Sequence, residues 1–248
     1  MKKLIFLLLF GALISCSKTI HVADTRVSGY EMDAGSASPD QHITAMIAPY
    51  KKELDKEMNQ VIGEVSSRME KRLPESTLGN WVADAIYTMA LNHDAGDGID
   101  FAIQNYGGIR IGSLSPGPVT TGMVYELMPF DNLISIMEMP GNIVDSLVHR
   151  FARSGGWPVS RELRFTIRDG KPVDVTIGGR PLDSDRTYQV AMPDYIANGG
   201  DRMDFLRGLP RNDMDYLIRD ALIDFIKAET LEGRAIEGML DGRIAILD

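Results

Sequence analysis

Cysteine and histidine are both scarce in this sequence, which has one cysteine and four histidines among 248 residues. A single thiol excludes an internal disulfide. Two fragments contain residue types that bind metals, Asp40-Gln41-His42 and Asn92-His93-Asp94, but they are isolated from each other. A two-metal centre that activates water needs a dense cluster of His and Asp ligands. The sequence therefore predicts no metal ligand in this chain and no metal-dependent hydrolysis by this chain alone.

Several catalytic and nucleotide-binding motifs are also missing. The sequence has no G-x-x-x-x-G-K-[ST] phosphate loop, no G-x-G-x-x-G and no G-x-S-x-G nucleophile elbow. The formal net charge of −9, a pI near 5.0 and the lack of a basic run argue against a nucleic-acid surface. No catalytic residue is predicted, although a Ser–His–Asp site assembled from distant positions stays an alternative.

The N-terminus has the features of an export signal. Lys2 and Lys3 precede an apolar stretch that ends in Leu13-Ile14-Ser15-Cys16. The stretch is too short for a membrane-spanning helix and is typical of a signal peptide. Its end resembles the bacterial lipobox, which makes Cys16 the expected lipidation site, with an ordinary signal peptide as the alternative. We expect a signal peptide over 1–15, a polar tether over 16–39, and lipid anchoring in the bacterial cell envelope, on the periplasmic side or the outer-membrane surface.

The remaining residues, 40–248, predict one domain of α+β class. Apolar residues at spacings of three and four predict helices, and short β-branched or alternating runs predict strands. The expected helices are 40–58, 76–90, 121–128, 142–154 and 213–228. The expected strands are 61–65, 100–104, 133–139, 163–168, 173–177, 188–192 and 243–247. Because the helices and strands follow no regular βαβ order, a mixed fold is favoured over a doubly wound sheet.

Three polar loops follow or precede apolar runs and could contact a ligand. The first runs from Asn105 through Gly107 and Gly108 to Arg110, which offers a planar fork of donors to a phosphate or carboxylate. The second contains Phe130, a stacking platform for a base, and Asn132, an amide for its polar edge. The third is Gly199-Gly200-Asp201. Each also has a plain structural reading, as a turn, a core phenylalanine or a surface ion pair.

Taken in order, four motifs resemble the C-terminal domain of the 5′-nucleotidase family, from about Asp40 to the end of the chain. They are Glu75-Ser76-x-Leu78-Gly79-Asn80, Asn105-x-Gly107-Gly108-Ile109-Arg110, Pro129-Phe130-x-Asn132 and Asn198-Gly199-Gly200-Asp201. The resemblance implies that full-length members have an N-terminal two-metal domain, which hydrolyses the phosphate ester, and that this C-terminal domain binds the nucleotide.

The resemblance implies a substrate-binding set in this chain. Arg72, Asn105 and Arg110 would contact the phosphate side of the substrate, with Gly107 and Gly108 in the same loop. Phe130 would form one half of an aromatic clamp around the base, and Asn132 would contact the base. Asp201 and Met203 belong to the late loop that carries the other half of the clamp.

This sequence departs from the family pattern at three places. Met203 occupies the position of the second clamp aromatic, with Phe205 two residues further on. Leu209 lies about where a carboxylate usually holds the ribose hydroxyls. Ser160-Arg161 replaces a Ser-Gly pair and would put a bulky charge beside the expected pocket.

Two functional hypotheses follow. In the first, the chain is a nucleotide-recognition subunit that acts in nucleotide or phosphoester hydrolysis with a separately encoded metallophosphoesterase. No cofactor is then expected in this chain, and the divalent metal lies in the partner. In the second, the chain is a non-catalytic periplasmic binding or scaffold lipoprotein with drifted nucleotide specificity. Neither hypothesis includes a nucleic acid, and the lipid anchor is the only expected membrane contact.

Overall fold

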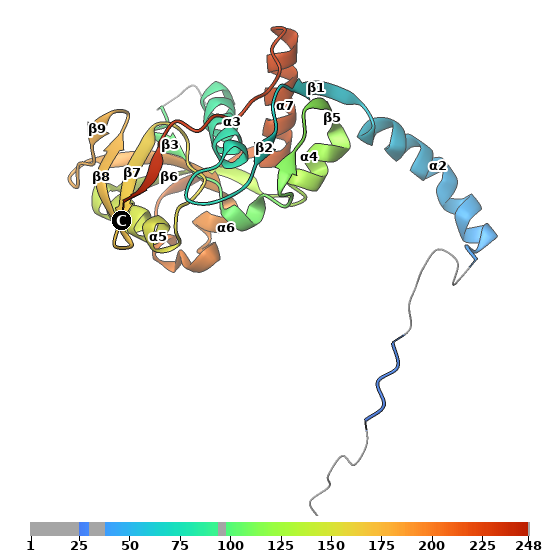
Figure 1. The fold of residues 1–248 in the computed structure, drawn as a ribbon, viewed down its shortest axis with the longest axis horizontal. Coiled ribbons are helices and arrows are strands. Elements are labelled where there is room, and N and C mark those ends of the chain that lie inside the picture. The colour runs from blue at the N-terminus through green and yellow to red at the C-terminus, as the bar shows by residue number, and fades with distance from the viewer. Residues whose placement is uncertain (1–24, 30–37, 94–97, 248) are drawn as a thin grey trace, which may run out of the picture. The chain divides into compact units, whose positions relative to one another are not determined.

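The computed structural model describes residues 25–29, 38–93 and 98–247 (Figure 1). The predicted signal peptide and the lipidation site Cys16 lie outside these residues. The chain divides into two compact units, residues 1–48 and 49–248, whereas the sequence placed the start of the domain at Asp40. Among the described helices, none combines the length and the apolar character that a membrane span requires.

Helix α2 (Gln41–Met58) begins where the sequence predicts it and continues through Pro49. The backbone N–H groups of His42 and Ile43 donate to Asp40 Oδ1 at 2.8 and 3.1 Å, which is the geometry of a helix N-cap. None of the residues of α2 is buried, so its predicted apolar face is uncovered in this structure. The division between the two units falls inside this helix.

The second unit contains the remaining elements. Its α-helices are α3 (Thr77–His93), α4 (Thr121–Leu127), α5 (Gly141–Arg153), α6 (Asp194–Ala197) and α7 (Ile218–Leu231). Its 3₁₀ turns are η1 (Tyr106–Gly108), η2 (Gly200–Arg202) and η3 (Asp204–Leu206). Its first strands are β1 (Val61–Val65), β2 (Met69–Glu70), β3 (Phe101–Ala102), β4 (Ser113–Leu114), β5 (Gly117–Thr120) and β6 (Leu133–Pro140). The later strands are β7 (Leu163–Arg168), β8 (Lys171–Ile177), β9 (Arg180–Pro181), β10 (Thr187–Pro193), β11 (Arg211–Leu217) and β12 (Ile244–Leu247).

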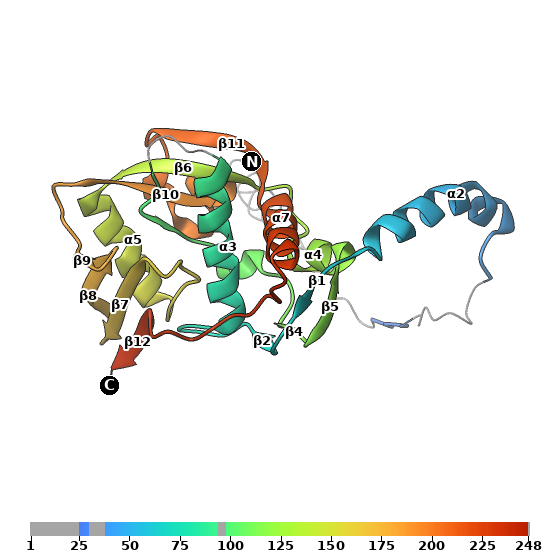
Figure 2. The ribbon, with the colours of Figure 1, turned by 90° about the horizontal axis from the view of Figure 1, so that it is seen from above.

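Two four-stranded sheets form the centre of this unit, with strand orders β11-β6-β10-β3 and β12-β7-β8-β9. In the first sheet β10 runs parallel to β3 and antiparallel to β6. Two smaller sheets pair β1 with β5 and β2 with β4. Helices α3 and α7 lie side by side next to the first sheet, and α5 lies between the two larger sheets (Figure 2). The α+β fold expected from the sequence is confirmed.

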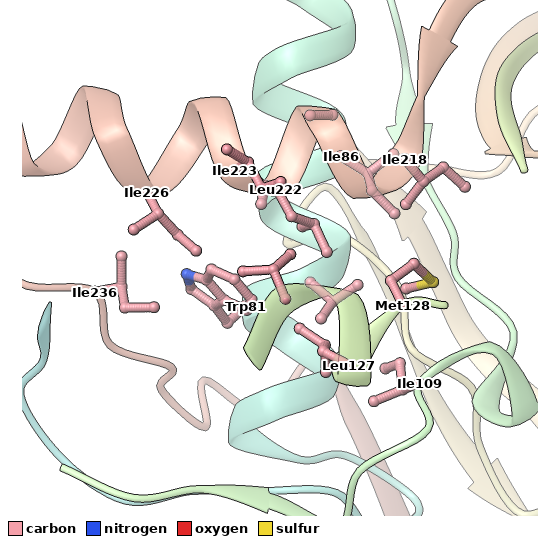
Figure 3. Packing of buried hydrophobic residues seen from close by; sticks show 14 of the residues in the cluster. Trp81, Ile86, Ile109, Leu127, Met128, Ile218, Leu222, Ile223, Ile226 and Ile236 are labelled. Carbon is pink, nitrogen blue, oxygen red and sulfur yellow. The ribbon is translucent and has the colours of Figure 1, made fainter. Parts of the chain in front are cut away.

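Two hydrophobic cores stabilise these layers. Figure 3 shows the first, in which Trp81 and Ile86 of α3 face Leu222 and Ile226 of α7, with Leu127 of α4 beside them. The second core packs α5 against β6, β7 and β10. Burying one such aliphatic side chain contributes about 1.5–3 kcal/mol, so these two cores supply the main driving force for folding. Trp81 is part of this core, and only 4% of it is exposed.

One predicted helix is partly wrong. The sequence predicts a helix over 213–228, but residues 211–217 form strand β11, and α7 begins only at Ile218. The reason is tertiary, because β11 completes the sheet by pairing with β6, where Asn212 lies opposite Ile136. The predicted strand over 100–104 is also shorter, with β3 limited to Phe101–Ala102.

The buried cation Arg243 joins the C-terminal segment to α3. Its guanidinium, which is 3% exposed, donates to both carboxylates of Asp84 and Asp241 at 2.8–3.0 Å and to the carbonyl of Val159 at 2.8 Å. Burial raises the pKa of Asp241, but the hydrogen bonds from Arg243 outweigh burial and hold this pKa below its ordinary value. A carboxylate with a depressed pKa stabilises the fold above its ordinary pKa and loses that contribution in acid.

We expect Arg243→Met to lower the free energy of unfolding by about 3 kcal/mol, because it removes the buried partner of two carboxylates and leaves them only the exposed Arg161 and Arg164. Urea denaturation at pH 7 measures this loss. The difference from wild type should narrow below about pH 4, the ordinary pKa of an aspartate, as Asp241 becomes protonated.

Arg164 provides a matched control, because it also pairs with Asp241, at 3.2 Å, but is 42% exposed. Arg164→Met should cost less than about 1 kcal/mol. Equal losses in the two variants would contradict the assigned role of Arg243.

Candidate functional site

Three chain segments meet at one edge of the first large sheet. Strands β3 and β10 are parallel neighbours, so the segments that follow them, beginning at Ile103 and Asp194, leave the sheet at the same edge. Strand β6 is antiparallel to β10, with Ile134 opposite Pro193, so the segment that precedes β6 reaches this edge as well. The sheet topology therefore brings together the three polar loops that the sequence identified.

A hydrogen-bond network connects two of these loops. The carboxylate of Asp201 accepts from Asn105 Nδ2 and from the hydroxyl of Tyr195, both at 3.1 Å. An ionised carboxylate only accepts, so Asn105 must present its amide NH₂ to Asp201 and its oxygen to the other side. That oxygen accepts from Gln104 Nε2 at 3.0 Å. Within the described residues, the buried Gln104 Oε1 is left without a donor.

The glycines of the two loops leave room for this network. A Cβ on Gly108 would overlap the amide of Gln104 and lie 2.7 Å from Asn105 Oδ1, so any larger residue would displace these two amides. A Cβ on Gly200 would lie 2.5 Å from the ring of Tyr195, so this ring lies directly against the loop backbone. Asp201 itself has a φ of 51°, a left-handed conformation that Asp and Asn tolerate better than most residues.

The third segment adds an aromatic ring and an amide. Phe130 is 43% exposed, and the guanidinium carbon of Arg110 lies 5.6 Å from the centre of its ring. Arg110 also donates to the carbonyl of Gly107 at 3.2 Å. Asn132 donates to Asp194 at 2.9 Å, which ties this segment to α6.

These residues surround a cavity of about 350 Å³. Its lining consists of Gln104, Asn105, Gly107, Gly108, Arg110, Met128, Phe130, Asn132, Tyr195 and Asp201. The cavity therefore has an aromatic wall, a guanidinium and several fixed amides, which can hold a planar group beside an anionic one.

A second cation lies close to the glycine loop. Lys71 donates to the carbonyls of Ile109, at 2.6 Å, and Tyr106, at 3.5 Å, and its ammonium lies 4.3 Å from the centre of the Tyr106 ring. Burial, and secondarily the charge of Arg110, lower the pKa of Lys71 from its ordinary value. Two cations thus lie near this loop in a chain of formal net charge −9.

Seven of the nine predicted binding residues line the cavity, and two do not. Arg72 is exposed and lies outside the lining. Met203 is 0% exposed and packs in the second core, so in this structure it offers no surface to a ligand. The positive φ angles of Asp201 and Arg202 turn the chain immediately before it, and the Met203 N–H donates to the carbonyl of Gly200 at 3.0 Å.

Two further departures from the family pattern lie outside the cavity. Arg161 is held by Asp84, which accepts from its backbone N–H at 2.9 Å and pairs with its guanidinium at 3.5 Å, so it does not fill the cavity. Leu209 packs against the second core. Phe205 is 39% exposed but does not belong to the lining.

Sequence reasoning missed three lining residues, Gln104, Met128 and Tyr195. Gln104 and Met128 directly precede predicted motifs, so their proximity in sequence was a usable signal. Tyr195 lies six positions before Asp201 on a helix of only four residues, and no spacing pattern marks it.

Comparison with known proteins identifies the family. The family described as "5′-nucleotidase, C-terminal domain" matches residues 54–208. A 5′-nucleotidase of Vibrio vulnificus is 29% identical over 180 residues, which cover 69% of this chain and 31% of the relative. The cell wall protein Lmo0130 of Listeria monocytogenes is 28% identical over 233 residues, covering 84% of this chain and 30% of the relative. This chain therefore spans about a third of the length of these relatives.

A solved structure shows the same fold. The 5′-nucleotidase precursor of Thermus thermophilus superimposes with a TM-score of 0.68 and 29% identity, over 85% of this chain and 44% of that one. The residues that follow α2, 59–248, make up a smaller share of this chain than the 85% that the superposition covers. The similarity therefore extends beyond the C-terminal end of α2 toward the N-terminus.

We expect Asp201→Asn to lower the free energy of unfolding by about 1–2 kcal/mol, because an amide supplies one acceptor oxygen in place of two for Asn105 and Tyr195. Asparagine tolerates the left-handed backbone at this position, so the substitution changes mainly the hydrogen bonding. Asp204→Asn is the control, since Asp204 is exposed and, among the described residues, forms an ion pair only with Arg207, at 3.0 Å. A loss of the same size in both variants, measured by urea denaturation, would argue against the network.

Proposed function

We propose that this chain, which belongs to the 5′-nucleotidase C-terminal-domain family, recognises a nucleotide for hydrolysis of its phosphoester by a separately encoded metallophosphoesterase. In this proposal the partner activates the water and this chain supplies the binding contacts. The chain would act in nucleotide catabolism as the recognition component of a two-component hydrolase.

The observation that supports this proposal is the composition of the cavity. Phe130 provides a face for a planar base, Asn132 and Asn105 provide amides, and Arg110 provides a cationic fork for a phosphate. The volume of about 350 Å³ falls within the range of small-molecule sites. A nucleotide combines a planar apolar group with an anion, which is the combination that this lining complements.

The residues of this chain also favour assigning water activation to a partner. In the described ranges there is no group of three or more His, Cys, Asp or Glu side chains that could hold a metal ion. The relatives extend well beyond the part that this chain matches. A partner chain would supply what that additional length supplies in them.

An envelope location fits this assignment. The apolar stretch before Cys16 and the lipobox-like sequence support export and lipid anchoring. The Listeria relative is named a cell wall protein. Anchoring two components to one membrane face would raise their effective concentration toward each other.

A second candidate function is a binding or scaffold protein with drifted specificity. It is favoured by one specific observation, the burial of Met203 at the position where the family carries its second clamp aromatic. Ligand titration distinguishes the two functions.

Calorimetric titration with AMP and adenosine tests the recognition function. We expect saturable binding with Kd of about 1 mM, as for half of a composite site. Phe130→Ala should abolish the binding of both ligands because the stacking surface is lost. Arg110→Met should weaken AMP about tenfold and leave adenosine nearly unchanged, because only AMP carries the phosphate.

Arg72→Met is the matched control, since Arg72 is exposed and lies outside the cavity lining. If it weakens AMP as much as Arg110→Met does, phosphate recognition extends beyond the cavity described above. Failure of the wild-type protein to bind either ligand would contradict the recognition function and favour the scaffold function.

We further expect Tyr195 to replace Met203 as the second aromatic surface. Tyr195→Leu should weaken adenosine binding at least about fivefold, because the loss of one stacking surface costs about 1 kcal/mol or more. Met203→Leu should leave adenosine affinity unchanged, since this side chain is buried in the core. The reverse order of effects in the same titration would show that the loop opens to expose Met203.

A further inference from the structure

The second unit has a groove that is separate from the cavity, with a volume of about 690 Å³. It is formed by the end of α2, by α4, by the end of β11 and by α7. We call it the acidic groove. Its lining consists of Glu57, Gln60, Thr121, Tyr125, Leu133, Asp215, Tyr216, Leu217, Asp220, Ile223, Asp224 and Lys227.

The charges of the acidic groove are unbalanced. Four carboxylates, those of Glu57, Asp215, Asp220 and Asp224, face a single cation, Lys227. None of these carboxylates takes part in an ion pair with another described residue. By contrast, Arg243, Arg219 and Arg234 each form an ion pair with at least one carboxylate elsewhere in the chain. Uncompensated acidic groups in a hollow attract a basic ligand surface.

Exposed apolar side chains continue this groove along α2. Tyr50 and Leu54 precede Glu57 by seven and three positions, so all three lie on one face of the helix. Tyr50 is 77% exposed and Leu54 is 56% exposed. A helix that buries none of its residues gains little tertiary stabilisation, although in proteins most helical stability comes from the packing of an apolar face. This face is therefore suited to being covered by another molecule.

The chemistry of the surface selects among the molecules that could cover it. A second copy related by a two-fold axis would place the same patch against itself, so the carboxylates would face carboxylates. An anionic lipid surface would be repelled for the same reason. The complementary occupant is a different protein that presents apolar and basic side chains together.

The acidic groove also adjoins the cavity. Tyr125 and Leu133 line the groove, whereas Phe130 and Asn132, between them in the sequence, line the cavity. Arg219, at the start of α7, donates to Asp131 at 2.7 Å and so connects α7 to the segment between Tyr125 and Leu133. A protein bound in the groove would therefore lie next to the site where the proposed function places the nucleotide.

We infer that the acidic groove, together with Tyr50 and Leu54, is the docking surface for the metallophosphoesterase. This inference rests on the proposed function. The family match begins at Leu54, within α2, and covers a C-terminal domain, so the additional length of a relative precedes this helix. A separate partner bound here takes the place that a covalent neighbour would occupy. Its contact surface carries Lys or Arg opposite the groove and apolar residues opposite α2.

The test uses the full chain and a purified metallophosphoesterase from the same genome that lacks this C-terminal domain. Binding is measured by calorimetry, at two salt concentrations. We expect the double variant Glu57→Lys/Asp215→Lys to weaken binding at least tenfold, because attraction becomes repulsion at the groove. Its affinity for AMP should equal that of wild type, since neither residue lines the cavity.

A second double variant, Glu138→Lys/Asp185→Lys, is the matched control, because it changes the net charge equally at exposed positions outside the groove. Leu54→Glu tests the apolar part and should also weaken binding while leaving AMP affinity intact.

Equal weakening by both double variants, or none by the groove variant, would overturn the inference. It would also be overturned if ultracentrifugation showed that the chain self-associates through the groove, or if no metallophosphoesterase of that genome bound wild type. AMP binding in these cases would leave nucleotide recognition standing, whereas a chain that docks the enzyme but binds no AMP would contradict recognition alone.

Discussion

The hydrogen bond between Asn105 and Asp201 holds the functional end of this molecule together. It joins loops that are 96 residues apart in sequence and that leave two parallel neighbours, β3 and β10. Because the carboxylate accepts only, the bond also sets the direction of the Asn105 amide and, through it, that of Gln104. The ring of Tyr195 is fixed by the second oxygen of the same carboxylate.

The second unit has two surface regions of opposite charge, the cationic glycine loop and the acidic groove. Lys71 and Arg110 concentrate positive charge at the glycine loop, although the chain is acidic overall. The acidic groove is lined by Tyr125 and Leu133, and the segment between them lines the cavity through Phe130 and Asn132. The opposite charges of these two regions favour an anionic small molecule in the cavity and a basic protein surface in the groove. Both regions depend on the first core, which fixes α4 and α7 (Figure 3).

The glycine-rich motifs show how packing and recognition share the same residues. Gly108 and Gly200 were candidates for close approach to a ligand, and the structure shows that each first makes room for a side chain of the protein, Gln104 and Tyr195 respectively. Gly107 has only the amide of Asn105 within reach of an added Cβ, at 3.8 Å, and so stays open toward the cavity. A motif of this kind therefore encodes the internal support of a site as well as its contact surface.

The sequence by itself determined the local elements and the polar loops. The spacing of apolar residues in α3 and α5, the Asp40 and Ser76 caps and the Asp169-Gly170 turn depend on neighbours in the chain, and all were predictable. The tertiary structure decided which loops meet, that residues 211–217 complete a sheet instead of extending α7, and that Tyr195 rather than Met203 faces the cavity. These outcomes follow from strand pairing and from the positive φ angles of Asp201 and Arg202, which depend on contacts distant in sequence and leave no periodic signal.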